Sequence, residues 1–361
     1  MITTRRCRPG RVPAGAAVLS VLLAVLLVGS PALAAPAEVP APEPVCAIDD
    51  QRIGELSGMA ADGGHRYAVN DGGRRIQVFV LDRSCRVQRV LTNSTDPYDV
   101  EDLALATDGT LWLADTGDNR KQRDTVALHA VRSDGRATLY RLTYPDGQHD
   151  AEALLLDRAG TPYLVTKNVL GRSEVYRPAE RLTSPGPTPL EKVGSLSLSA
   201  TDTPGGPVGP TGSVLVTGGA VSADGTVVAL RTYTDAYLYP APDGDVVAAL
   251  GRQPVRVPLP DEPQGEAIAF EPDGTLLSAS EGVGQPVRAV PGAAGLVGEA
   301  GTDGPNAGRP GGEPPADSRA ADPAGEESMP VLPAVAVVVA LAAAALGLNK
   351  LRRQRHRRPG R

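Results

Sequence analysis

The chain has 361 residues, with 41 Gly and 34 Pro, 3% aromatic residues and a formal net charge of −6. Its basic residues gather at the two ends: four lie in residues 1–34 and seven in residues 350–361. Between these segments 25 basic residues stand against 42 acidic ones, a net of −17. So acidic a central region repels nucleic acid and anionic lipid, which excludes nucleic-acid binding, but it tolerates cations.

The N-terminal segment has the three parts of a secretory signal. Arginines in the first 11 residues precede an uncharged apolar run at residues 16–28, and Ala32-Leu33-Ala34 forms a small-x-small cleavage pattern. We predict a signal peptide over residues 1–34, cleaved after Ala34, with an uncleaved anchor as the alternative. Residues 35–44 are rich in Ala, Pro and Glu and predict a flexible lead-in.

The C-terminal part predicts a membrane anchor. Residues 329–349 carry no charge, and 21 residues at about 1.5 Å each cross a bilayer core as a helix. The basic tail at 350–361 belongs on the cytoplasmic side. Residues 291–328 are dominated by Gly, Pro, Ala and acids, which predicts a disordered stalk. The expected location is therefore the bacterial cell membrane, with a single-pass anchor and the folded domain outside.

Two cysteines remain after removal of the signal, Cys46 and Cys85. Exported proteins meet an oxidising environment, so we predict a disulfide between them.

Residues 45–290 predict an all-β domain that repeats. Short apolar runs alternate with Asp-Gly, Gly-Gly and Pro turns, and helical periodicity is almost absent. Five segments share a strand–turn–strand form at spacings of 46, 51, 65 and 49 residues. Their turn glycines are Gly63, Gly109, Gly160, Gly225 and Gly274. Units of this length with four short strands, repeated radially, predict a β-propeller, with five blades favoured and six as the alternative.

The first strand of each segment has a small face, as at Gly58, Ala104 and Ala153, which suits an innermost strand where neighbours approach closely. The last unit supplies only three strands. We expect residues 45–53 to provide its missing outer strand, which would join the first and last blades and remove an open edge. A β-sandwich or a string of hairpins is the alternative fold.

The strings LSGMAADGG, DVEDLALATDGTLWLADTGDNR and HDAEALLLDRAGTPYLVTK resemble secreted bacterial β-propellers. The resemblance covers roughly residues 53–292, and the nearest groups are esterase-like or phytase-like propellers beside the lactonase and NHL-type propellers. It implies a ligand site at the mouth of a central channel. Some members of these groups are calcium-dependent hydrolases.

Four glutamates occupy equivalent places, eight residues before a turn glycine: Glu55, Glu101, Glu152 and Glu266, with Thr217 in the fourth unit. Radial repetition would gather them around one axis. Converging carboxylates suit Ca²⁺, which takes six to eight oxygen ligands. Without a cation such a ring repels itself, so the alternative is that each glutamate caps loop amides separately.

A second set follows the second strand of each segment, at what we expect to be the opposite end of the repeat. It mixes acids such as Asp115 with the cations Lys167 and Arg231, which suits a polar or anionic organic ligand. The loop at residues 115–123 adds oxygens from Asp118 and Asn119, although tight turns favour the same residue types. Solvated loop residues are the alternative reading.

The mature outer region has three histidines, and His149, beside Asp150, is the best placed for acid–base chemistry. No G-x-S-x-G, H-E-x-x-H, C-x-x-C or P-loop motif appears. The sequence therefore favours a surface binding or scaffold module that contacts a small ligand or an envelope protein. The alternative is a calcium-dependent hydrolase of the phosphoesterase, esterase or lactonase type, with its site at the channel mouth.

Overall fold

The structure is a computed structural model that describes residues 39–300. The predicted signal peptide, membrane helix and basic tail lie outside the described residues, as does most of the predicted stalk. Among the helices of the described part, none combines the length and apolar character needed to span a membrane.

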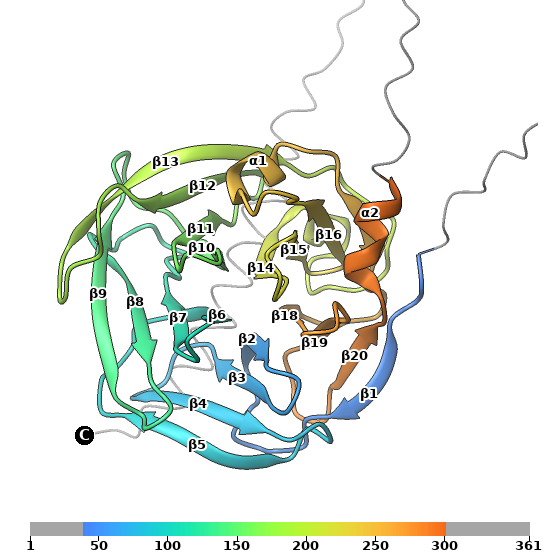
Figure 1. The fold of residues 1–361 in the computed structure, drawn as a ribbon, viewed down its shortest axis with the longest axis horizontal. Coiled ribbons are helices and arrows are strands. Elements are labelled where there is room, and N and C mark those ends of the chain that lie inside the picture. The colour runs from blue at the N-terminus through green and yellow to red at the C-terminus, as the bar shows by residue number, and fades with distance from the viewer. Residues whose placement is uncertain (1–38, 301–361) are drawn as a thin grey trace, which may run out of the picture. The chain divides into compact units, whose positions relative to one another are not determined.

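The domain is built from five antiparallel units of four strands each, arranged around a centre (Figure 1). The first four units follow the chain in order. They are β2 (Leu56–Ala61), β3 (Arg66–Asn70), β4 (Ile76–Leu81) and β5 (Val87–Asn93); β6 (Val100–Leu105), β7 (Leu111–Asp115), β8 (Val126–Val131) and β9 (Ala137–Thr143); β10 (Ala151–Leu156), β11 (Pro162–Thr166), β12 (Arg172–Pro178) and β13 (Thr188–Ser197); and β14 (Val216–Val221), β15 (Val227–Thr232), β16 (Asp235–Pro240) and β17 (Val255–Pro258).

The fifth unit is completed by the N-terminal strand. It contains β18 (Gly265–Phe270), β19 (Leu276–Ser280) and β20 (Pro286–Val290), and β1 (Glu43–Ala47) pairs with β20 at its outer edge. The inner strands β2, β6, β10, β14 and β18 each contact the inner strands of both neighbouring units, so the ring is closed. This is the propeller arrangement expected from the sequence, and the closing strand covers Glu43–Ala47 where residues 45–53 were predicted.

Close approach at the centre explains the small residues of the inner strands. A β-carbon built on Gly58 would stand 2.5 Å from the backbone nitrogen of Leu103 in β6, and one on Gly218 would stand 2.3 Å from the carbonyl oxygen of Glu266 in β18. Further out, five hydrophobic clusters lie between adjacent units, with Leu155 and Val228 in one and Phe79 and Leu277 in another. Burial of the apolar side chains in these clusters is the main favourable contribution to the free energy of folding.

One parallel contact interrupts the regular pattern. The outer strand β13 of the third unit pairs with β9 of the second, Thr188 opposite Leu142, so these two units share one eight-stranded sheet. The described part has four short helices. The connections between strands contain η1 (Gly209–Val214) and α1 (Val246–Leu250), and η2 (Ala293–Gly295) and α2 (Leu296–Ala300) follow β20.

The folded part continues past residue 290, where the stalk was predicted to begin. Ala293 is fully buried and Val297 is 7% exposed, and both pack into the cluster between the fourth and fifth units. A count of large apolar residues missed this extension because it contributes few side chains to the core, Ala293 and Val297 with Ala294 and Leu296 beside them. On the N-terminal side, Val39, from the predicted lead-in, packs against the same cluster.

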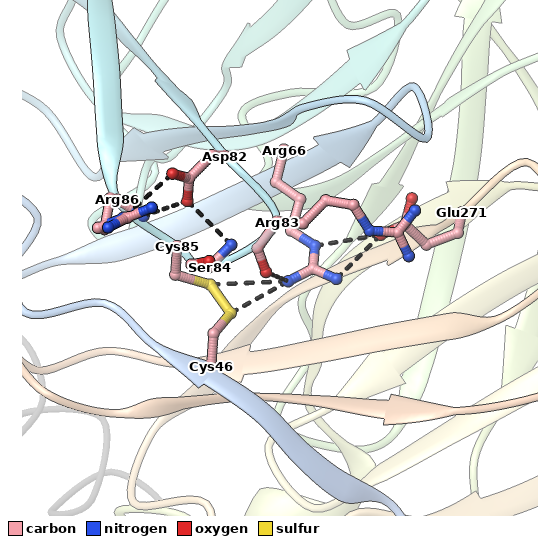
Figure 2. The surroundings of a disulfide bond; sticks show 8 residues. All are labelled: Cys46, Arg66, Asp82, Arg83, Ser84, Cys85, Arg86 and Glu271. Atoms are coloured by element: carbon pink, nitrogen blue, oxygen red, sulfur yellow. Dashed lines mark hydrogen bonds and ion pairs between the residues drawn. A yellow bond between two sulfur atoms is a disulfide. The ribbon is translucent and has the colours of Figure 1, made fainter.

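The predicted disulfide joins Cys46 to Cys85, with a Cα–Cα distance of 5.8 Å, and links the closing strand β1 to the β4–β5 turn of the first unit. Figure 2 shows Arg66 beside it: the guanidinium contacts Cys46 Sγ at 3.0 Å and forms an ion pair with Glu271 at 3.0 Å. Because Glu271 follows β18, this pair crosses from the first unit to the fifth at the ring closure.

Candidate functional site

Every inner strand carries a β-bulge at the same place, near its N-terminal end. The register with the second strand shifts across one residue in all five hairpins. The residues at the shift are Ser57, Glu101, Glu152, Thr217 and Glu266. A bulge bends the strand and re-aims its side chain, so the five equivalent side chains emerge together at one end of the ring.

This register corrects the equivalence of Glu55. The turn glycine Gly63 stands two residues after its strand, whereas Gly109 stands four residues after β6, so counting back eight residues overshoots in the first unit. The equivalent residue is Ser57, whose hydroxyl donates to the carbonyl oxygen of Glu101 at 2.6 Å. Glu55 lies before β2 and joins neither of the carboxylate groups found at this end of the described ring.

The two predicted residue sets lie at the same end of the ring, not at opposite ends. In each antiparallel hairpin the start of the inner strand pairs with the end of the second strand, as Val100 does with Asp115 and Ala151 with Thr166. The glutamates of the inner strands and Lys167, directly after β11, are therefore neighbours.

Five carboxylates gather at this end, and we call them the mouth carboxylates: Asp71, Asp99, Glu101, Asp150 and Glu152. They form two overlapping groups that share Glu101, and within each group one oxygen per residue lies within 4.8 Å of the others. Asp71 is half-buried, and the other four are 1–7% exposed. Asp99 and Asp150 were not among the predicted metal ligands. Their signal in the sequence is the Asp-x-Glu pattern, which occurs at 99–101 and again at 150–152.

The loop after β7 fixes the spacing between these carboxylates. Thr116 Oγ1 donates to the carbonyl oxygen of Ala151 at 2.7 Å, and the amide of Asp118 donates to Asp150 Oδ1 at 2.7 Å. Between them, a β-carbon on Gly117 would stand 1.9 Å from Glu101 Oε1 and 2.4 Å from Asp99 Oδ2. Only glycine lets the carboxylates lie directly against this backbone.

Asp115 and Asp118, predicted as ligand-binding residues, organise the loop. Asp115 accepts the amides of Tyr98 and Asp99 and pairs with Arg123 at 3.0 Å and His129 at 3.1 Å. Burial opposes its ionisation, but His129 and Arg123 outweigh burial and lower the pKa of Asp115 to about 2. Asp118 accepts the amides of Gln122 and Arg123. Asn119 is exposed at the tip of the loop.

Lys167 is a buried cation that pairs with one of the mouth carboxylates. Its ammonium pairs with Glu152 at 2.8 Å and lies 5.3 Å from the ring centre of Tyr233. Burial disfavours the charged amine, but Glu152, Tyr233, Asp150 and Glu266 outweigh it and hold the pKa of Lys167 well above its usual value. Lys167 is therefore a fixed positive charge, suited to holding an anionic group and unsuited to act as a base.

Arg231 and Asp102 have structural roles: both are buried and connect the strands that carry the site. Arg231 is fully buried, pairs with Glu262 at 2.7 Å and donates to backbone oxygens that include that of Ala267. Asp102 is also fully buried and accepts the amides of Leu154 at 2.8 Å and Gly219 at 3.0 Å, which ties three inner strands together. Burial raises the pKa of Asp102 well above its usual value, against the effect of these hydrogen bonds.

His149 lies outside the mouth carboxylates. Its Nε2 contacts Asp146 Oδ1 and the hydroxyl of Tyr176, both at 3.0 Å. The remaining glutamate of the predicted ring, Glu266, accepts from Gln264 at 3.1 Å and belongs to neither carboxylate group. The structure thus brings together two of the four predicted metal ligands, Glu101 and Glu152.

No protein-family model matches the chain, and no curated protein matches it in sequence. Solved structures that it resembles include a luciferin-regenerating enzyme (15% identity, 66% of this chain and 78% of that one, TM-score 0.39) and a gluconolactonase from Xanthomonas campestris (18%, 71% and 86%, 0.37). Another is a PQQ-bound aldose sugar dehydrogenase from Streptomyces coelicolor (11%, 70% and 99%, 0.37). These are propeller-type folds, as the sequence resemblance implied, and the likeness concerns the fold alone.

Proposed function

We propose that this protein is a divalent-cation-dependent hydrolase, with the cation held among the mouth carboxylates. The observation that carries the proposal is the convergence of carboxylate oxygens in this cluster. Five acids stand within two overlapping groups, each with one oxygen per residue within 4.8 Å of the others, and four of the five are buried. Buried like charges are costly unless a cation compensates them.

The donor set fits a hard cation. All five side chains offer carboxylate oxygens, the ligands that Ca²⁺ and Mg²⁺ prefer. Glu101, common to both groups, is the central ligand, with Asp99 and Asp150 beside it, and the Gly117 backbone leaves room for the cluster. A bound divalent cation there would polarise an ester or phosphoryl oxygen and lower the pKa of a coordinated water.

The residues around the cluster would then orient the substrate. Lys167, permanently protonated, offers an anchor for a phosphate or carboxylate group. The mouth carboxylates would accept a proton from a coordinated water, and Lys167 pairs with one of them, Glu152. This combination favours phosphate esters, carboxylic esters or lactones as the substrate class.

The test is a calcium titration of the purified full chain followed by a hydrolysis assay. We expect calcium to raise the melting temperature of the wild type, and the rise to vanish in a Glu101→Gln/Glu152→Gln double variant. Asp243→Asn, an exposed acid away from this end, is the control. Hydrolysis of p-nitrophenyl phosphate, p-nitrophenyl acetate or a δ-lactone should require calcium. Turnover that survives a chelator, or calcium binding unchanged in the double variant, would refute the proposal.

A binding module at the cell surface is the second candidate, and the loops around the mouth favour it. Among the described residues, five large hydrophobic side chains are exposed, and four of them stand on loops at the mouth end: Tyr98, Val169, Leu170 and Val283. Apolar side chains around a polar centre are typical of a recognition surface. Calcium binding without hydrolysis of any of the three substrates would favour this function.

For both functions we propose that the domain works outside the cytoplasm, anchored by the predicted C-terminal helix. The Cys46–Cys85 disulfide supports an oxidising compartment. Protease added to intact cells should release the domain from the cell surface, and full protection from protease would contradict this location.

A further inference from the structure

A second group of donors lies outside the mouth carboxylates, between the connector that leads from β9 to β10 and the strand β12. It contains Asp146 and His149 from the connector and Glu174 and Tyr176 from β12. We propose that these four side chains form a binding site for a divalent transition-metal ion, with Zn²⁺ as the occupant.

The local sequence aims all four side chains at one point. Glu174 and Tyr176 are two residues apart on a strand, so they share one face. Asp146 and His149 are three residues apart in a turn that contains Gly147 at φ +105°. The resulting pattern, Asp-x-x-His with Glu-x-Tyr, brings one nitrogen and three oxygens together from two segments about 25 residues apart in the chain.

The distances are close to the edges of a coordination tetrahedron. Four of the six edges can be given for one atom per ligand: the Tyr176 hydroxyl oxygen lies 2.8 Å from Glu174 Oε2, 3.1 Å from Asp146 Oδ1 and 3.0 Å from His149 Nε2. His149 Nε2 lies 3.0 Å from Asp146 Oδ1. Ligands bound to zinc at about 2.0 Å stand about 3.3 Å apart. An outward movement of a few tenths of an ångström would therefore make room for the ion.

Hydrogen bonds inside this group do not use every lone pair of its oxygen atoms. The single phenol proton of Tyr176 reaches one neighbour at a time, and His149 Nε2 donates to Asp146 or accepts from Tyr176 according to its tautomer. Lys192 pairs with Glu174 Oε1, the oxygen that faces away from Tyr176, so it orients the carboxylate without occupying the centre. A divalent cation at the centre would satisfy all four donors together.

The surroundings hold the two ring ligands in place. The Tyr144 ring packs edge-on against His149 at 5.0 Å and against Tyr176 at 4.8 Å. Tyr176 is fully buried, while the side chains of His149 and Asp146 are 17% and 41% exposed, which leaves a path for the ion. Imidazole combined with oxygen ligands suits Zn²⁺ better than Ca²⁺, which takes oxygen ligands only.

Metal binding at this second site would restrict the position of one mouth carboxylate, because the two sites share a short stretch of chain. His149 directly precedes Asp150, one of the mouth carboxylates, so the ion would fasten the connector to β12 and thereby fix Asp150. His149 and Tyr176 are positioning residues in this scheme.

The test uses the full chain, stripped with a chelator and titrated with Co²⁺ as a spectroscopic probe and with Zn²⁺ as competitor. We expect one Co²⁺ per chain with the visible absorption of a four-coordinate site, displaced by Zn²⁺. His149→Gln and Tyr176→Phe should each weaken Co²⁺ binding at least tenfold, with unchanged circular dichroism. The matched control is His65→Gln, because Asp62, His65 and Tyr67 repeat part of the arrangement. That group supplies fewer than three metal-binding His, Cys, Asp or Glu residues in the described region.

Two results would overturn the inference. One is an absorption spectrum that persists unchanged in His149→Gln and Tyr176→Phe. The other is a spectrum that disappears in Glu101→Gln and persists in His149→Gln, which would assign the cobalt to the mouth carboxylates. Neither result bears on calcium binding at the mouth, which the double variant there tests separately.

Discussion

Gly117 and Glu101 are in direct contact: a β-carbon at position 117 would stand 1.9 Å from Oε1 of the glutamate. The loop after β7 and the bulge of β6 therefore fit together only when residue 117 has no side chain. This contact sets the position of Glu101, which both groups of mouth carboxylates share.

Gly117→Ala should weaken calcium binding by about 10–100-fold, the usual effect of disturbing the surroundings of metal ligands. The added methyl group must displace Glu101 and Asp99 from the loop. Calorimetric titration with calcium measures the change. Gly298→Ala is the control, because a β-carbon there meets no atom within 4 Å. An unchanged affinity in Gly117→Ala would show that the cation does not depend on these two carboxylates.

Asp102 should make the stability of the domain depend on pH. Its pKa in the folded protein is raised by burial, so the stability it contributes is fully present below the unfolded pKa of about 4 and is lost as the pH rises through the folded value. Asp102→Asn removes this titration. The NH2 group of asparagine also faces backbone amides that now donate to the Asp102 side chain, at a cost of about 1–3 kcal/mol.

Urea unfolding of wild type and Asp102→Asn from pH 5 to pH 9 checks this prediction. The wild type should lose stability relative to the variant as the pH rises. A difference between the two proteins that stays constant over this range would show that Asp102 is ionised throughout, and one that grows in favour of the wild type would contradict its raised pKa.

The repeat, the closing strand and the disulfide could be predicted from the sequence, because each has few alternatives: the turns recur, the last unit lacks one strand and two cysteines remain. Asp-Gly turns and alternating small residues define the inner hairpins, and Cys46 and Cys85 are the two cysteines left after removal of the predicted signal. The equivalence of Glu55 was wrong because the turn before Gly63 is shorter, and a glycine count cannot detect a changed turn length.

Predicting which residues form the site requires knowing how the strands pair. Recognising that an antiparallel hairpin brings the start of one strand beside the end of the next would have placed Lys167 next to Glu152. The burial of Arg231 could not be foreseen, because its partner Glu262 lies 31 residues away in an irregular connection. The group of donors around Tyr176 was also not predicted from the sequence. Glu-x-Tyr on a strand is a common pattern, and it indicates a site only when the segment with Asp146 and His149 is known to lie beside it.

Asp115 should have the opposite pH dependence to Asp102. Its pKa is lowered to about 2 in the folded protein, so its contribution is present above the unfolded pKa of about 4 and is lost as the pH falls toward 2. The shift corresponds to about 2 kcal/mol. Asp115→Asn should therefore be destabilised relative to wild type at pH 7, and the difference should shrink in acid. Equal stability of the two proteins at pH 7 would contradict the role of the pairs with His129 and Arg123.

The disulfide should stabilise the ring closure. Cys46 lies in β1 and Cys85 in the first unit, so the bond prevents the closing strand from leaving β20. A closed loop of 39 residues corresponds to about 3–4 kcal/mol in the chain-entropy model. Cys46→Ser/Cys85→Ser should lose about this much unfolding free energy in urea, and protease should cut near β1 first. Reductant should lower the stability of the wild type and leave that of the double variant unchanged. If the wild type keeps its stability after reduction, while both thiols titrate as free, then hydrogen bonds and packing alone hold β1 in place.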